Sequence, residues 1–363
     1  MVKNCYIHIP FCNNICSYCD FSKLLYNEEL VDKYLTSLEN EIKNNYKNEK
    51  LETIYIGGGT PSSLSIKQLK RLFEITKVFN LDNKYEYSIE CNFNSINKEK
   101  LLLFKEYGIN RLSFGIESIN DKNLRLLNRD EDKEEIKEKI KLCKSLGFNN
   151  INVDLMYAIC NETMEELQKD IEFVLSLDVE HISTYSLIIE KNTKLYIDKY
   201  KNIDEEIDYK MYEEIIKRLS NSMYIHYEIS NFAKRGYYSK HNMCYWKNNE
   251  YYGFGLGASK YLNNKRINNT KNMTKYLKGV VESSYEDISM NDKMTYEMIL
   301  GLRLLDGVNE FEFYKKYNKH IEDIFNINSL LNKGLLKQNN NNIYIPEDKM
   351  YIRNEILVNF IME

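Results

Sequence analysis

A length of 363 residues is enough for one large domain and a smaller one, and the net charge is only −4. No block of like charges exceeds a few residues, which disfavours a nucleic-acid-binding or membrane-surface protein. No apolar run is long enough for a membrane-spanning helix, so we expect no direct membrane anchor. The 8 cysteines occur without a secretory signal peptide or a small disulfide-dense scaffold, which favours a reducing, cytoplasmic compartment.

Short strands and helices alternate through the first half of the chain. The apolar patterns predict strands over residues 5–10, 51–56, 85–90, 111–116, 150–156 and 181–187. The helices predicted between them span residues 28–47, 66–79, 97–107, 132–146 and 164–177. Repeated strand–helix units with short links indicate an α/β protein with a parallel sheet, and about six units fit a partial (β/α)6 barrel. In such barrels the chemistry lies at the C-terminal ends of the strands.

The pattern changes toward the C-terminus, and three segments are expected: 1–230, 231–290 and 291–363. Residues 263–289 are polar and poorly periodic, which is typical of a linker. After them we expect a small helical, winged-helix-like domain. Its expected helices span residues 293–305, 311–317, 321–331 and 351–361, with a small hairpin over 334–336 and 342–345.

Three cysteines near the N-terminus, Cys12, Cys16 and Cys19, have the spacing CxxxCxxC. Thiols so spaced can ligate three corners of a cubane iron–sulfur cluster, which leaves the fourth iron open to a small molecule. Zinc is the alternative; it usually takes four protein ligands, and His8 could be the fourth. The other cysteines are interpreted as small buried side chains: Cys5, Cys91, Cys143, Cys160 and Cys244.

Polar residues recur where the predicted strands end. Three consecutive glycines, at 57–59, let the backbone approach a ligand closely. Each polar residue taken singly could be a cap or an ion-pair partner, but together they are better explained by one ligand. Glu90 ends the third predicted strand, Glu117 follows the fourth, Arg129 closes the segment after it, and Asp154 lies within the fifth.

These motifs together resemble the radical S-adenosylmethionine (SAM) superfamily, and within it the oxygen-independent coproporphyrinogen oxidase group. The matching segments, in order, are YIHIPFC, GGGTPS, RLSFGIES with a following LNR, and VDLMY. The resemblance implies that Cys12, Cys16 and Cys19 ligate a [4Fe–4S] cluster whose open iron chelates SAM. It implies SAM contacts for Tyr6, Gly58, Gly59, Thr60, Glu90, Glu117, Arg129 and Asp154.

The chain departs from the group's pattern at two places. Glu117 stands where the group usually has Gln, and a carboxylate cannot donate a hydrogen bond as an amide does. Residues 157–163 read YAICNET where the group usually has YGLPGQT, which affects the expected loop shape rather than the barrel.

Two subgroups share this framework, and the resemblance favours the haem chaperone subgroup over the dehydrogenase. The dehydrogenase has a further Cys where this chain has Phe21, and it has an extended arm where only eleven residues precede Cys12 here. The chaperone subgroup has Phe at that position and an HNxxYW motif, which this chain carries at residues 241–246.

The HNxxYW motif suits a haem site, because imidazole is a common axial ligand of haem iron. We therefore expect His241 to ligate haem, with Cys244 as a rival ligand and with Tyr245 and Trp246 against the porphyrin face. The alternative is that His241 is a hydrogen-bonded structural residue and that the two aromatic side chains belong to the core.

The leading hypothesis is a haem chaperone that delivers haem to an acceptor apoprotein and carries a [4Fe–4S] cluster with SAM as an exchangeable ligand. The alternative is an enzyme, coproporphyrinogen III dehydrogenase, which decarboxylates propionates by radical chemistry. Radical tRNA modification is disfavoured because no basic surface or RNA-binding module is visible, so we expect no nucleic-acid partner. A homodimer is compatible with the resemblance.

Overall fold

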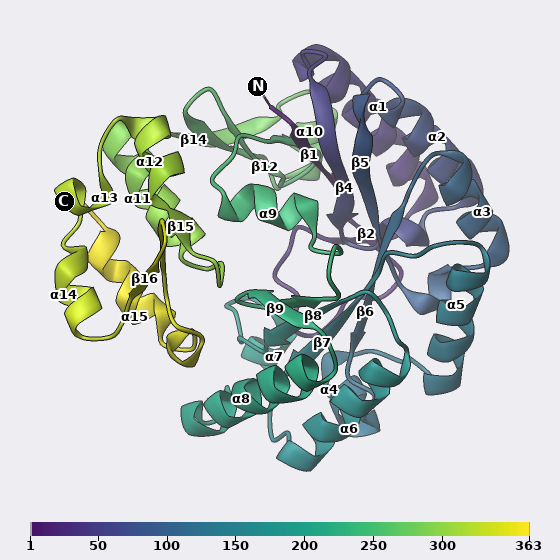
Figure 1. Cartoon of the computed structure of the whole chain (residues 1–363). Coiled ribbons are helices and arrows are strands. Elements are labelled where there is room, and N and C mark those ends of the chain that lie inside the picture. The colour runs from purple at the N-terminus through teal and green to yellow at the C-terminus, as the bar shows by residue number, and fades with distance from the viewer. Residues whose placement is uncertain (1, 363) are drawn as a thin grey trace.

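The computed structural model describes residues 2–362, and its larger part is an open barrel with helices outside a curved sheet (Figure 1). Nine strands form the sheet in the order β11-β1-β4-β5-β6-β7-β8-β10-β9. Six of them are parallel neighbours in chain order: β1 (Asn4–Ile9), β4 (Lys50–Gly58), β5 (Asn80–Cys91), β6 (Arg111–Glu117), β7 (Ile151–Tyr157) and β8 (His181–Ser186). The predicted partial barrel is confirmed, since the two edge strands, β11 and β9, do not pair with each other.

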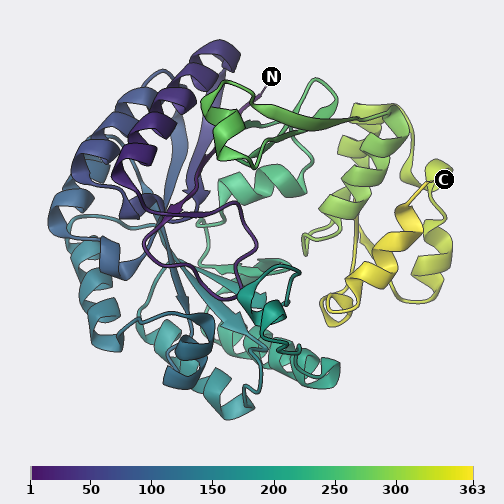
Figure 2. The ribbon, with the colours of Figure 1, turned by 180° about the vertical axis from the view of Figure 1, so that it is seen from behind.

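The helices form an outer layer around the convex side of the curved sheet, as the view from behind shows (Figure 2). It comprises α1 (Glu28–Asn45), α2 (Ile66–Thr76), α3 (Lys98–Glu106), α4 (Asp121–Leu127), α5 (Lys133–Ser145), α6 (Met164–Ser176) and α8 (Glu205–Asn221). Each buries one apolar stripe; in α1, Val31, Leu35 and Leu38 are fully buried, which stabilises the fold by roughly 2 kcal/mol per side chain. Capping boxes begin α2 at Ser65 and α6 at Thr163, so backbone N–H groups are satisfied where these helices start.

Short elements complete both edges of the barrel. Strand β11 (Tyr252–Phe254) pairs in parallel with β1, while β10 (Asn231–Ala233) joins β8 to β9 (Ile225–Glu228) through antiparallel pairing. Between these edges runs α9 (Lys240–Trp246), which contains the HNxxYW motif. At the other end of the barrel, β2 (Phe11–Cys12) and β3 (Leu24–Leu25) bracket the cysteine loop, and α7 (Lys194–Ile197) packs beside it, with the Leu195 N–H donating to the Ser17 carbonyl.

The prediction that residues 263–289 form a linker is wrong. Strands β12 (Ser259–Leu262), β13 (Lys265–Asn269) and β14 (Glu282–Asp287) form an antiparallel sheet, and α10 (Met273–Leu277) lies between the last two. All six residues of β14 are exposed, so this strand lacks the apolar alternation that identifies a half-buried strand. Asn263 and Asn264 both have positive φ, as the two-residue turn between β12 and β13 requires.

The C-terminal part is helical with a small wing, as predicted. Its helices are α11 (Met290–Gly301), α12 (Glu310–Tyr317), α13 (Ile321–Ile324), α14 (Ile327–Asn332) and α15 (Arg353–Leu357). The wing pairs β15 (Val308–Asn309), β17 (Asn342–Tyr344) and β16 (Lys337–Asn339). The single helix expected over 321–331 is broken at Phe325, whose backbone is extended. None of the helices within residues 2–362 combines the length and apolar character needed to cross a membrane.

Candidate cofactor site

The cysteine loop leaves β2 at the C-terminal end of the barrel and is fastened to its neighbours by backbone hydrogen bonds. The Tyr26 N–H donates to the Cys12 carbonyl at 2.8 Å, and the Ser17 N–H donates to the Leu127 carbonyl at 3.0 Å. Cys12 is buried, whereas Cys16 and Cys19 are half-buried. The segment after β3 and the C-terminal end of α4 therefore hold the backbone from which the thiols project.

The three thiols lie close enough to influence one another. Burial raises the pKa of Cys12 to about 11, and the other two thiols add to this rise. In a cubane cluster each thiolate binds its own iron, so the sulfurs need not converge on one point.

Within residues 2–362 no three His, Cys, Asp or Glu side chains are grouped to hold a single metal ion. His8, the candidate fourth zinc ligand, bonds through Nε2 to the Ser22 carbonyl at 2.7 Å and through Nδ1 to the Tyr6 hydroxyl at 2.9 Å. The donor set thus fits a cluster better than zinc.

The glycine run at the end of β4 lies between the cysteine loop and β5, and no side chain fits at any of its three positions. A Cβ at Gly57 would meet the Glu90 carboxylate at 2.7 Å, and one at Gly58 would meet the His8 ring at 2.6 Å. A Cβ at Gly59 would lie 2.9 Å from the Cys12 sulfur. The run therefore brings bare backbone against the thiol, as the sequence predicted for a ligand-contacting loop.

Glu90 ends β5 and is held by groups from β4. It accepts the Gly58 N–H at 2.8 Å and the Tyr55 hydroxyl at 3.0 Å. Burial raises the pKa of Glu90 to about 7, against the lowering effect of these two hydrogen bonds. Its partners orient the carboxyl group next to the glycine run.

Arg129 is the cation at the centre of the site. One Nη lies 3.6 Å from the Cys16 sulfur and 3.5 Å from Glu117, and the other lies 2.5 Å from Glu131. The buried Arg129 Nε and Glu131 Oε2 atoms have no hydrogen-bond partner within residues 2–362. Both atoms are therefore free to form a hydrogen bond with a ligand. Glu131 was missed from the sequence, although it stands only two residues after Arg129.

Glu117 is the last residue of β6 and has a φ of 63°, a conformation that side-chain-bearing residues rarely adopt. Such strain concentrates at functional sites. The Tyr18 hydroxyl, which comes from the cysteine loop, donates to Glu117 at 3.0 Å. Tyr18 is a second residue missed from the sequence; its position between two of the cysteines was the available signal.

Asp154 completes the polar end of the barrel from β7. It accepts the Asn152 side-chain amide at 2.8 Å. Burial raises the pKa values of Asp154 and Glu117. The Asp154 carboxylate raises the pKa of Glu117 further, while Arg129 lowers both values. The structure thus brings Glu117, Arg129 and Asp154 close together, and Glu90 lies near Asp154.

Tyr6 lies deeper in the barrel than these groups. Its ring stacks on Tyr55 with centroids 6.2 Å apart, and its hydroxyl reaches His8 rather than the cysteine loop directly. The His8 ring that Tyr6 holds is the ring that a Cβ on Gly58 would meet, so Tyr6 contacts the glycine run indirectly, through His8.

His241 lies at the opposite end of the barrel. Its side chain bonds to Thr53, near the start of β4, through Nδ1 at 2.7 Å, and to Tyr245 through Nε2 at 2.8 Å. The ring is 1% exposed and stacks on Tyr55 at 5.3 Å. Burial, with Arg111 nearby, lowers the pKa of His241 to about 3. Both ring nitrogens are engaged, so iron coordination by His241 requires one of these hydrogen bonds to break.

Comparisons with known proteins agree with this geometry. The family model of the radical SAM superfamily matches residues 6–174. "Heme chaperone HemW" of Bacillus subtilis (strain 168) is 36% identical, with 100% of both chains covered. The protein of the same name from Escherichia coli (strain K12) is 30% identical over 99% of this chain and 98% of the relative.

A solved structure, "Coproporphyrinogen III oxidase (HemN) from Escherichia coli is a Radical SAM enzyme", superposes with a TM-score of 0.87. It is 21% identical and covers 99% of this chain and 90% of that chain, and at this identity it supports the fold alone. An open α/β barrel with a three-cysteine loop at its mouth defines the class as radical SAM proteins, whose cofactors are a [4Fe–4S] cluster and SAM. The chain belongs to the radical SAM superfamily and, within it, to the family of the HemW heme chaperones.

Proposed function

We propose that this protein is a haem chaperone, which binds haem and passes it to an acceptor apoprotein. The observation that carries the proposal is full-length similarity to proteins named heme chaperones, at 36% and 35% identity in two relatives. A local observation supports it: Phe21, which takes the place of a cysteine in the dehydrogenase subgroup, is 67% exposed beside the cysteine loop. The chain therefore offers no thiol at that position.

At the barrel mouth, Cys12, Cys16 and Cys19 are proposed to hold the [4Fe–4S] cluster. The cluster, when bound, supplies an open iron for SAM and an electron for its reduction. The residues proposed to hold SAM are Tyr6, Gly58, Gly59, Thr60, Glu90, Glu117, Arg129 and Asp154.

The charges of the site suit SAM. Three carboxyl groups have raised pKa values: Glu117 and Asp154 lie near the cation Arg129, and Glu90 lies near Asp154. SAM carries a sulfonium and an ammonium group beside a single carboxylate, so its positive charges can meet the carboxyl groups while its carboxylate meets the arginine. Glu117 is buried, whereas Glu90 and Asp154 are half-buried.

For haem, the sequence assigns the iron ligand to His241, and this assignment stays a proposal. The imidazole must first exchange its bond to the Tyr245 hydroxyl for the metal, which requires α9 to move. We also propose a cytoplasmic location, a homodimer as the assembly, and division of the chain into 1–230, 231–290 and 291–363.

Anaerobic haem titration of the cluster-reconstituted protein, followed by the Soret band, tests the function. Saturation near one haem per chain, followed by haem transfer to an apoprotein acceptor, is the expected result. A protein without saturable binding is not a haem chaperone. In a parallel incubation with SAM and a reductant, vinyl product from coproporphyrinogen III, detected by LC–MS, would establish the dehydrogenase alternative instead.

A further inference from the structure

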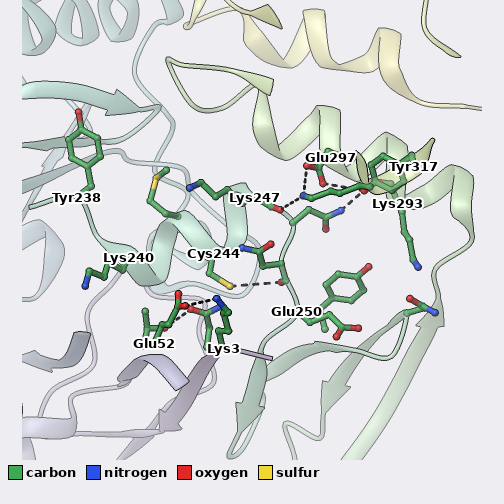
Figure 3. A pocket seen from close by; sticks show the side chains of 18 residues that line it. Lys3, Glu52, Tyr238, Lys240, Cys244, Lys247, Glu250, Lys293, Glu297 and Tyr317 are labelled. Atoms are coloured by element: carbon green, nitrogen blue, oxygen red, sulfur yellow. Dashed lines mark hydrogen bonds and ion pairs between the residues drawn. The ribbon is translucent and has the colours of Figure 1, made fainter. Parts of the chain in front are cut away.

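A cleft of about 730 Å³ lies beside α9 (Figure 3), and no residue of the cysteine loop lines it. The side chains that α9 contributes to it follow the spacing of one helix face: Lys240, Met243, Cys244 and Lys247. The opposite wall comes from α11 and α12, with Lys293, Glu297, Lys316 and Tyr317. Its size is that of a typical small-molecule site.

The cleft has an excess of positive charge. Five lysines and three glutamates line it. Lys3 pairs with Glu52, and Lys316 pairs with Glu297, both at 2.6 Å. The ammonium groups of Lys247 and Lys293, one on each wall, have no ion pair or hydrogen bond within residues 2–362. Two unpaired cations facing one cleft are suited to a ligand that carries two carboxylates.

The same cleft offers apolar and aromatic surface. Tyr238, Tyr261 and Tyr317 line it together with the thioether of Met243. A flat ring system can pack against such side chains while its acidic groups reach the lysines. Among the groups of α9 that can bind iron, Cys244 is 3% exposed and His241 faces the barrel interior, whereas Met243 is half-buried at the cleft surface. Thioethers are known axial ligands of haem iron.

We propose that haem binds in this cleft, with its two propionates on Lys247 and Lys293 and its iron facing Met243. The inference rests on the proposed function and locates the cargo. In this arrangement Met243 takes the place of His241 as the residue that faces the iron, so α9 need not open, because the cleft is already accessible. The cleft lies at the other end of the barrel from the SAM site.

The test is haem titration of the cluster-reconstituted full chain in three forms: wild type, Lys247→Ala/Lys293→Ala, and Met243→Leu. The double variant is expected to raise the haem dissociation constant about tenfold, as for loss of exposed charged contacts. Met243→Leu is expected to shift the Soret maximum. Metal-free protoporphyrin IX is the second probe: its affinity should fall in the lysine variant and stay unchanged in Met243→Leu.

Matched controls come from the rest of the surface. Lys67→Ala/Lys70→Ala removes two exposed lysines of α2, and Met223→Leu replaces a methionine that is 84% exposed. Neither should change haem binding. If wild type binds haem and the lysine variant binds it equally well, the cleft assignment is wrong while the chaperone function stands. If wild type itself fails to bind haem, the proposed function fails and the cleft has no cargo.

Discussion

The buried state of His241 makes a pH-dependent prediction that can be worked out in numbers. Its pKa is about 3 in the folded protein, whereas an unfolded histidine titrates near 6.5. Because the folded pKa is lowered, the unfolded chain binds the proton first on acidification, and stability is lost as the pH falls below 6.5. Between pH 8 and pH 5.5 the loss attributable to this residue is about 1.4 kcal/mol.

The variant His241→Asn isolates this contribution. At pH 8 the variant should be less stable than wild type by about 2–4 kcal/mol, since it leaves the Tyr245 hydroxyl without a partner and the ring's volume unfilled. Asparagine does not titrate, so this difference should shrink by about 1.4 kcal/mol at pH 5.5. His181, which is also buried with a lowered pKa, is present in both proteins and cancels.

Urea unfolding followed by far-UV circular dichroism, at pH 8 and pH 5.5 and with equal cluster content, measures the difference. If the difference in unfolding free energy between wild type and His241→Asn is the same at both pH values, the reasoning is refuted. It would mean that His241 titrates normally in the folded protein and is therefore open to solvent, which would favour it as an accessible iron ligand.

The other predictions concern the barrel mouth. Cys12→Ala should abolish bound iron and sulfide on reconstitution, whereas Cys160→Ala should retain both; chemical analysis of iron and sulfide distinguishes the two outcomes. Gly59→Ala should also lower cluster content, because its Cβ would lie 2.8 Å from the Phe11 carbonyl, while Gly236→Ala, where nothing lies within 4 Å, should not; equal cluster content would contradict the packing argument. Arg129→Ala should lower stability by about 3–5 kcal/mol and weaken SAM binding measured by calorimetry, since it leaves buried carboxylates without a cation; unchanged values for both would show that this arginine has no central role.

Local patterns were sufficient for most of the barrel. Strands buried on both faces and helices with one apolar stripe have distinct periodicities, so the six parallel strands and five of the helices between them were predictable. The short elements β2, β3 and α4 were not predicted. The same holds for the polar strand ends: parallel strands end at one edge, which brings Glu90, Glu117 and Asp154 together. The sheet of β12 to β14 could not be predicted in this way, because its exposed strand carries no apolar alternation.

The sequence by itself determined the class of the protein, because cluster ligands within one loop and the strand–helix alternation are encoded by short-range spacing. Only the tertiary structure decided where the HNxxYW motif lies. His241 bonds to Thr53, a residue 188 positions away, and no local pattern specifies a contact between such distant segments. The same packing placed His241 inside the barrel and turned Met243 and Lys247 toward the outer cleft. These residues lie on different faces of one helix, and the sequence of the helix does not say which face packs against the barrel.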